Sequence, residues 1–184
     1  MNHSFLSAAL ALLAMGTSAV AAADDPAAVA NDFYGVYATF HPSDGIPDAK
    51  ARAKLGPFIS PALDRLLVAG EAAEAHFAQV TKNMSPPLIE GDLFTSNFEG
   101  ATAFHIGGCT TSGETAQCSV SFTYRGDRKD EKPAAWTDRL YLVRNRNDWR
   151  VDDIGYGATW AFGNKGRLKN VLAGAIRDGN SATP

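Results

Sequence analysis

The sequence has few of the residues from which metal and nucleotide sites are built. It contains two cysteines and four histidines, and neither type recurs at Cys-x-x-Cys or His-x-x-x-His spacing. The glycine run at 155–160 begins like a dinucleotide-binding fingerprint, but it lacks the last glycine and follows a late strand pattern. No serine hydrolase elbow is present. These absences predict no metal ion, no cofactor and no assigned catalytic residue.

Clustered positive charge is also missing. The 17 Lys and Arg residues against 20 Asp and Glu residues give a net charge of -3, and the two signs are interspersed along the chain. No basic stripe is present that could displace counterions from phosphates. We therefore expect no nucleic-acid partner.

Long apolar runs are absent except at the start of the chain. Residues 5–20 carry no charge, are too short to span a bilayer, and precede small-x-small sites at 19–21 and 21–23. This pattern predicts a signal peptide over 1–23 and a single domain over 24–184, located in the periplasm or secreted. No stable membrane insertion is expected after cleavage. The alternative for the first segment is a buried N-terminal helix of the folded domain.

Capping residues, prolines and apolar side chains at helical spacing predict four helices. The four are expected from Asp25-Pro26 to about His41, from Pro47 to Leu55, from Ser60-Pro61 to about Lys82, and from an Asn164 cap to just before Gly179. After Pro86-Pro87 the composition shifts towards Thr, Phe, Val, Tyr and Gly, which is typical of strands and turns.

The most informative segment is 101–125, in which two cysteines flank a turn. Gly113-Glu114 suits a type II′ hairpin turn, and counting outward from it places Cys109 opposite Cys118 at a non-hydrogen-bonded position. Side chains approach closely enough there for a disulfide in an oxidising compartment. Two buried free thiols are the alternative.

The same register conflicts with the apolar pattern further along the hairpin. Counted strictly, Phe104 and Ile106 point to the opposite face from the apolar residues of the partner strand. One extra residue at Gly107-Gly108 repairs this, because it aligns Ile106 with Val120 and Phe104 with Phe122. Glycine pairs tolerate such an insertion, so we predict a β-bulge there.

A second hairpin is predicted after the charged segment 125–133, which we interpret as a solvated loop. Strand character returns at 136–143, a turn follows at 145–148, and a partner strand occupies 149–154. Helices first and antiparallel strands afterwards predict an α+β domain in which helices cover one face of a curved sheet, with a C-terminal helix.

Three stretches carry a resemblance to a known fold. The helix at 32–37 (DFYGVY), the strand at 141–143 (YLV) and the strand at 148–156 (DWRVDDIGY) together resemble an NTF2-like or cystatin-like domain. More narrowly, they resemble the DUF3828 group of small exported bacterial proteins, in which Trp-x-Val-x-x-Ile-x-Tyr precedes a leucine-bearing C-terminal segment. The resemblance covers about residues 29–176. It implies a cone-shaped sheet wrapped around a long helix, with a pocket at the open end in some members, and it implies no activity.

The residues that we expect to bind a ligand at such an open end are Tyr37, His105, Tyr156 and Trp160, which are polar or aromatic. The function we predict is that of a non-enzymatic periplasmic binding protein for a small ligand or an envelope protein partner.

Two alternatives stay open. One is an inhibitor or immunity protein that neutralises a cell-envelope enzyme with the charged segment 125–133. The other is a small isomerase-like or hydrolase-like enzyme whose pocket uses Asp32, Tyr37 and His105.

Overall fold

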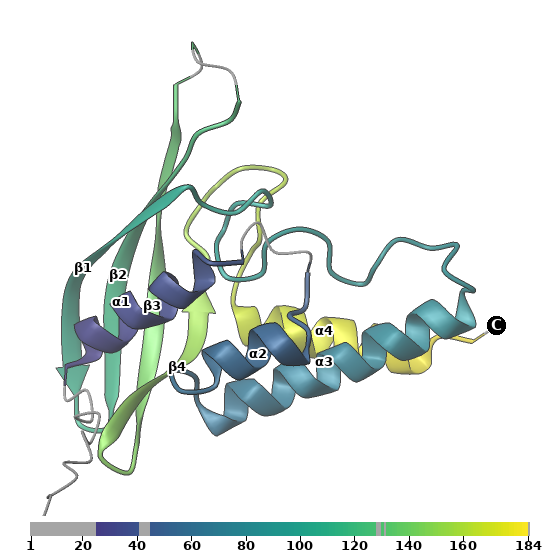
Figure 1. Ribbon diagram of the computed structural model, residues 1–184, viewed down its shortest axis with the longest axis horizontal. Coiled ribbons are helices and arrows are strands. Elements are labelled where there is room, and N and C mark those ends of the chain that lie inside the picture. The colour runs from purple at the N-terminus through teal and green to yellow at the C-terminus, as the bar shows by residue number, and fades with distance from the viewer. Residues whose placement is uncertain (1–24, 41–44, 128–129, 131, 184) are drawn as a thin grey trace, which may run out of the picture.

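The computed structural model describes residues 25–40, 45–127, 130 and 132–183, which form helices and an antiparallel sheet (Figure 1). The elements are α1 (Pro26–Tyr37), α2 (Ala49–Leu55), α3 (Pro61–Val80), β1 (Ala103–Ser112), β2 (Thr115–Tyr124), β3 (Ala134–Asn145), β4 (Asp148–Gly155) and α4 (Leu168–Ser181). The predicted α+β class is therefore confirmed. The predicted signal peptide over 1–23 lies outside the described residues.

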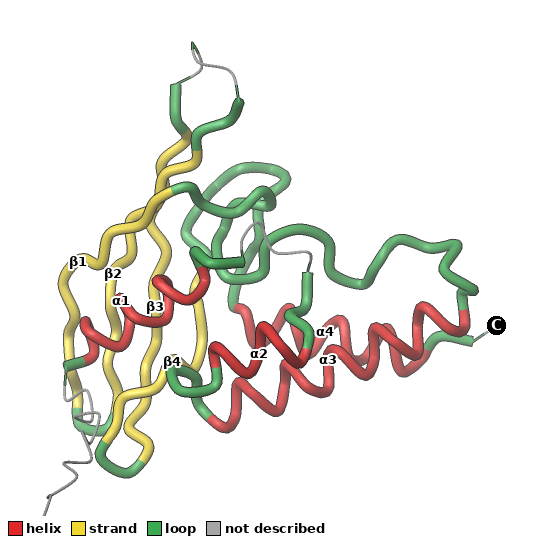
Figure 2. Tube along the Cα trace, in the orientation of Figure 1, coloured by secondary structure: helices red, strands yellow, loops and turns green. Residues whose placement is uncertain are grey.

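The strands form one sheet in which each strand pairs with the next along the chain, in the order β1-β2-β3-β4 (Figure 2). Side chains alternate across this sheet, as the pleat of a strand requires. On β2 the buried ones are Ala116, Cys118, Val120 and Phe122, and those between them are exposed. We call the face that carries the buried side chains the inner face, and the opposite, exposed face the outer face.

Helix α1 covers part of the inner face. The Asp25 side chain accepts a hydrogen bond from the Ala27 N–H at 2.9 Å, and Pro26 occupies the first turn. The buried stripe of the helix packs on the sheet, with the ring of Tyr34 centred 5.1 Å from that of Phe122. Residues 38–40 tighten into turns with i to i+3 hydrogen bonds, so the helix ends four residues before the predicted position.

Helices α3 and α4 run side by side beyond β4, with α2 beside α3 (Figure 1). Helix α3 begins where predicted, and the Ser60 Oγ accepts a hydrogen bond from the Leu63 N–H at 3.0 Å. Helices α3 and α4 approach closely at Gly179, where a side-chain carbon would lie 2.7 Å from the Ala73 carbonyl oxygen. Within the described ranges, none of the helices combines the length and apolar character needed to cross a membrane.

The bounds of α4 differ from the prediction at both ends. The helix begins at Leu168, and the Asn164 amide does not cap it but donates to the carbonyl oxygens of Asp92 and Thr95, each at 2.7 Å. Gly179 lies inside the helix and not past its end. In both cases a contact with a distant segment of the chain replaces the local role that the sequence predicts.

The first hairpin has the predicted register. Cys109 pairs with Cys118 and forms the disulfide, with Cα atoms 4.0 Å apart. Ile106 pairs with Val120, and the register shifts between Ile106 and Cys109, so the bulge at Gly107-Gly108 is confirmed. The hairpin turn has Gly113 at a φ of 56°, in the region that favours glycine.

The second hairpin is also confirmed, and its first strand is longer than predicted. Strand β3 begins at Ala134, and the turn to β4 places Arg146 at a φ of 60°. The charged loop before it is only partly within the described residues.

The long connection from α3 to β1 contains no strand among the described residues, although its composition is typical of strands. Residues 92–96 are buried and irregular. Side chains from distant elements satisfy their carbonyl groups: the Tyr34 hydroxyl donates to the Phe94 oxygen at 3.1 Å, and the Tyr156 hydroxyl donates to the Leu93 oxygen at 2.7 Å. This buried connection supports the end of the sheet where β4 stops.

Candidate functional site

A row of paired residues crosses the outer face at the end of β4. Ser119 pairs with Arg139, Arg139 pairs with Gly155, and Gly155 forms a bridge with Arg167. Since neighbouring strands lie about 4.8 Å apart, the two arginines start about 10 Å from each other. Gly155, which lies between them in the row, has no side chain, and the Tyr141 ring lies over it: a carbon added at Gly155 would be 3.1 Å from that ring.

Both arginines line a cleft of about 360 Å³, which falls within the range of small-molecule sites. We call it the arginine cleft and define it by Gln117, Ser119, Arg139, Tyr141, Gly155 and Arg167. Glycines surround it, and at Gly108 an added side-chain carbon would meet no atom within 4 Å. A side chain at Gly108 would therefore extend into open space of the cleft.

Arg167 is held in place by two neighbours. Its guanidinium carbon lies 3.7 Å from the centre of the Tyr141 ring, and its Nη1 donates to Asp153 Oδ2 at 3.0 Å. Asp153 also accepts hydrogen bonds from the backbone N–H groups of Ile154 and Lys169. The stacked ring and the paired carboxylate leave Arg167 with a fixed orientation and a partly neutralised charge.

Arg139 differs from Arg167 in its charge balance. It is exposed on the outer face, and no described residue forms an ion pair or hydrogen bond with its guanidinium. The exposed side chains of Thr110, Gln117 and Ser119 lie beside it and add hydroxyl and amide donors. Chemically, the lining of the cleft combines hydroxyl and amide groups with an exposed guanidinium that no other described residue pairs with, and that set suits an oxyanion or carboxylate.

A buried carboxylate supports the wall of the cleft. Asp138 is 2% exposed and accepts hydrogen bonds from the Ser96 N–H at 2.8 Å, the Gly157 N–H at 2.9 Å and the Trp136 indole N–H at 3.1 Å. The Ser96 hydroxyl also donates to it, while the Ser96 Oγ accepts from the N–H of Gly157 at 2.9 Å. These bonds attach the loop after β4 to both the sheet and the buried connection.

Burial raises the pKa of Asp138 above its ordinary value, while the hydrogen bonds from Ser96, Gly157 and Trp136 act in the opposite direction. The sequence contains one signal for this cluster, because Asp138 stands in an inward-facing series with Trp136, Leu140 and Leu142. An acidic residue at a core position of a strand indicates a buried polar partner.

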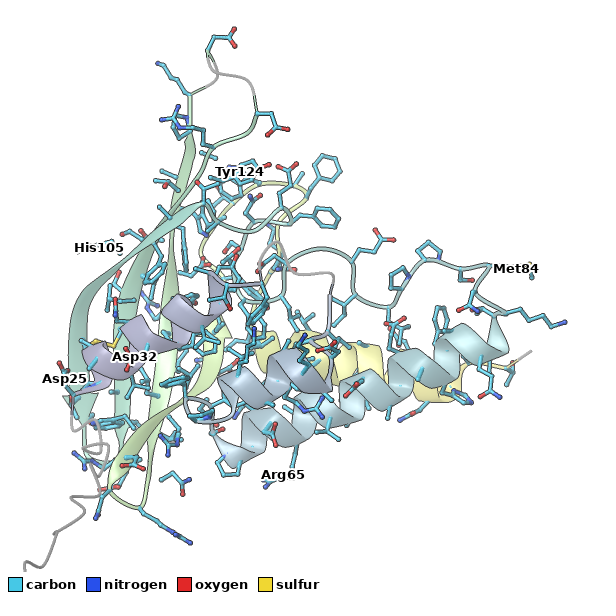
Figure 3. The ribbon with its side chains drawn as sticks, viewed as in Figure 1. Asp25, Asp32, Arg65, Met84, His105 and Tyr124 are labelled. Atoms are coloured by element: carbon cyan, nitrogen blue, oxygen red, sulfur yellow. A yellow bond between two sulfur atoms is a disulfide. The ribbon has the colours of Figure 1, made fainter. Side chains whose placement is uncertain are left out.

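The four predicted ligand-binding residues occupy different places. Tyr37 is 1% exposed, donates to Asp92 Oδ2 at 2.7 Å, and accepts from the Ala101 N–H at 3.0 Å. Burial, together with the nearby Asp92, raises the pKa of Tyr37 well above its ordinary range. His105 is exposed on β1, paired with Ser121 (Figure 3).

Tyr156 and Trp160 lie on the loop after β4. Tyr156 lines the arginine cleft. Trp160 packs edge-on against Trp136, with ring centres 5.2 Å apart, and lines a separate hollow of about 570 Å³ together with Asn97 and Glu99. The structure thus brings only Tyr156 to the cleft, and it does not gather the four residues at one site.

The residues of the enzyme alternative are also distributed over different surroundings. Asp32 is exposed on α1, Tyr37 is buried, and His105 is on the exposed face of β1 (Figure 3). Within the part of the chain that the structure describes, no group of three His, Cys, Asp or Glu residues could hold a metal ion.

Fold and cleft together define an α+β protein whose exposed sheet face carries a donor-rich, arginine-lined site. No family model matches the chain, and neither does any curated protein. Among solved structures, the solution structure of a SEC-C motif containing protein from Rhodopseudomonas palustris is similar over 73% of this chain and 80% of that chain, with 13% identity and a TM-score of 0.41. A likeness at this level identifies no family.

Proposed function

We propose that the protein is a non-enzymatic binding protein that takes a small anionic ligand, carrying a carboxylate, sulfate or phosphate group, in the arginine cleft. The observation that carries this proposal is that Arg139, which is exposed and forms no ion pair with another described residue, lines one cleft together with Arg167. A guanidinium binds such groups through two parallel hydrogen bonds.

The remaining features of the cleft support binding over catalysis. Apart from Asp138, the polar groups that line it alongside the arginines are hydroxyls and an amide, which donate and accept hydrogen bonds but do not titrate near neutral pH. Asp138, which also lines the cleft, has its oxygens engaged by Ser96, Trp136 and Gly157. The site can therefore orient an anion, and it offers no free acid or base.

We also propose a periplasmic or secreted location and a relation to the NTF2-like or cystatin-like fold, including the DUF3828 group. The disulfide between Cys109 and Cys118 supports an oxidising compartment. The placement of α1 across the inner face of a four-stranded meander supports the fold relation. The inhibitor alternative, which depends on segment 125–133, stays a prediction.

Isothermal titration with inorganic phosphate, inorganic sulfate and D-galacturonate tests the binding proposal, with uncharged D-galactose as the reference ligand. At least one of the three anions should bind, and Arg139→Gln should weaken that binding about 10- to 100-fold, the effect of losing a charged hydrogen bond. Binding should also weaken as the salt concentration rises.

Arg65→Gln is the matched control, because Arg65 is exposed on α3, away from the sheet (Figure 3). It should leave the affinity unchanged. Gly108→Leu gives a second test, since it places a side chain in the open space of the cleft and should abolish binding without unfolding the protein. If none of the anions binds, or if Arg139→Gln binds as the wild type does, the proposal is wrong.

A further inference from the structure

The arginine cleft continues into a second hollow on the same face. This hollow measures about 560 Å³ and shares Thr110, Gln117, Tyr141 and Arg167 with the cleft. It extends towards the hairpin turn, where Ser112 and Thr115 line it. We call the two hollows together the outer-face groove.

The length of the groove follows from β3. Thr137 lines one end of the groove and Val143 lines the other, and both lie on the outer face with Arg139 and Tyr141 between them. The six steps along the strand from Thr137 to Val143, at about 3.4 Å each, make a groove of about 20 Å. That length is several times the width of one sugar ring, so a monomeric ligand would occupy only part of it.

The floor of the groove carries several hydroxyl groups and an amide. The side chains that β1 and β2 present to it are Thr110, Ser112, Thr115, Gln117 and Ser119. Each of these donates and accepts hydrogen bonds, which matches ligand hydroxyl groups that do the same. Tyr141, Leu142 and Val143 of β3 add apolar surface to the hairpin half of the groove.

The position of the groove also discriminates between extended ligands. An extended peptide gains most of its affinity by pairing its backbone with the edge of a sheet, whereas this groove lies across a face and offers side chains. A nucleic acid carries a phosphate at every step and needs many cationic contacts. Here Arg139 and Arg167 stand together in one row, and Asp152 lies in the hollow beyond them.

We infer that the outer-face groove binds an acidic oligosaccharide lying along the strands, with a uronate carboxylate at Arg139 and Arg167 and further sugar units over Thr115 and Val143. This inference rests on the proposed function and adds the ligand class and the direction of the chain.

Isothermal titration of oligogalacturonides of one, two and four units tests it. The affinity of the wild type should rise at least tenfold from the monomer to the tetramer, because the added units contact the hairpin end of the groove. Maltotetraose, which is uncharged and of the same length, should bind at least tenfold more weakly than the acidic tetramer.

The decisive variants are Val143→Glu and its matched control Val143→Gln. The carboxylate of Val143→Glu repels the acidic chain at the far end of the groove, so it should lower the affinity for the tetramer about tenfold relative to Val143→Gln. The affinity for the monomer should be the same in both variants.

The possible failures are distinguishable. If the monomer binds in an Arg139-dependent way and the tetramer binds no more tightly, the oligosaccharide inference is wrong while the proposed anion site stands. Equal binding of maltotetraose and the acidic tetramer also contradicts the inference. If neither the monomer nor phosphate nor sulfate binds, both proposals fail.

Discussion

Asp138 attaches the loop after β4 to the rest of the molecule. It is buried on the inner face of β3 and accepts hydrogen bonds from Ser96, Trp136 and Gly157. A carboxylate has two oxygens that only accept, whereas an amide has one oxygen and an NH₂ group that donates. If an amide replaces the carboxylate, its NH₂ group faces N–H donors of the protein in a buried place and cannot accept their hydrogen bonds.

Asp138→Asn should lower the free energy of unfolding by roughly 2–4 kcal/mol, the cost of leaving buried donors unpaired. Urea denaturation followed by circular dichroism measures it. Ser121→Ala is a suitable control, since that hydroxyl is exposed on the outer face, and it should change the stability by less than about 0.5 kcal/mol.

The difference in unfolding free energy between the wild type and Asp138→Asn should depend on pH in a definite direction. Because burial raises the pKa of Asp138, the folded protein binds this proton more tightly than the unfolded chain does. The stability that this carboxyl contributes is complete below its ordinary pKa of 3.8 and falls as the pH rises through the folded pKa. Groups common to both proteins cancel, so the gap between wild type and Asp138→Asn should narrow as the pH rises. A gap that widens would contradict the assigned direction.

Among the elements, those set by local interactions are predicted well from the sequence. The hairpin of β1 and β2 is predicted pair by pair, because a two-residue turn fixes the register and the apolar pattern then requires the bulge at Gly107-Gly108. The starts of α1 and α3 follow from Asp25 and Ser60, which cap their own helices. Each of these signals lies within a few residues of its effect.

The elements that depend on distant contacts are not predictable in this way. Asn164 is a good capping residue, but it bonds to the buried connection 92–96 instead, so α4 starts later. The connection itself is irregular because Tyr34 and Tyr156 satisfy its carbonyl groups from other parts of the chain. No local pattern in the sequence contains that information.

Two glycines of α4 should respond in opposite ways to the same substitution. At Gly179 a side-chain carbon would lie 2.7 Å from the Ala73 carbonyl oxygen, whereas at Gly174 its nearest neighbour is the end of the Arg177 side chain at 3.9 Å. Gly179→Ala should separate α3 from α4 and destabilise the protein by about 1–3 kcal/mol. Gly174→Ala should stabilise it by about 0.5–1 kcal/mol, because alanine loses less backbone entropy in a helix.

Thermal denaturation of both variants checks this pair. The melting temperature should fall for Gly179→Ala and rise for Gly174→Ala. Two changes of the same sign would mean that the close packing of α3 on α4 is not as described.

In the molecule as a whole, the candidate site arises from topology. Arg139 and Arg167 are 28 positions apart, and they become neighbours only because β3, β4 and the segment after β4 align in one row. The sequence predicts both hairpins but not this row, because the contact of Arg167 with Gly155 follows an irregular loop. Tyr37 and His105, which are predicted as ligand-binding residues from their side-chain type alone, lie elsewhere because side-chain type does not show which residues the fold brings together.

The disulfide should contribute to the stability of the whole fold without being necessary for it. Closing a loop of this length restricts the unfolded chain by about 2–3 kcal/mol, while the core from α1, the sheet and α4 persists. Urea denaturation with and without dithiothreitol should show a loss of about that size with native circular dichroism before the transition. The double variant Cys109→Ala and Cys118→Ala should not respond to dithiothreitol. A response there, or no response in the wild type, would contradict the assignment.

Because side chains alternate in direction along β1, β2 and β3, each strand contributes one set of residues to the packed core and another set to the exposed outer face. Cys118, Val120 and Phe122 face the packed interior, while Gln117, Ser119 and Ser121 between them face water. Natural selection can therefore exchange the outward residues among descendants of this protein with little penalty in folding. If the proposed anion site is correct, its ligand preference can diverge over generations while the scaffold is inherited unchanged.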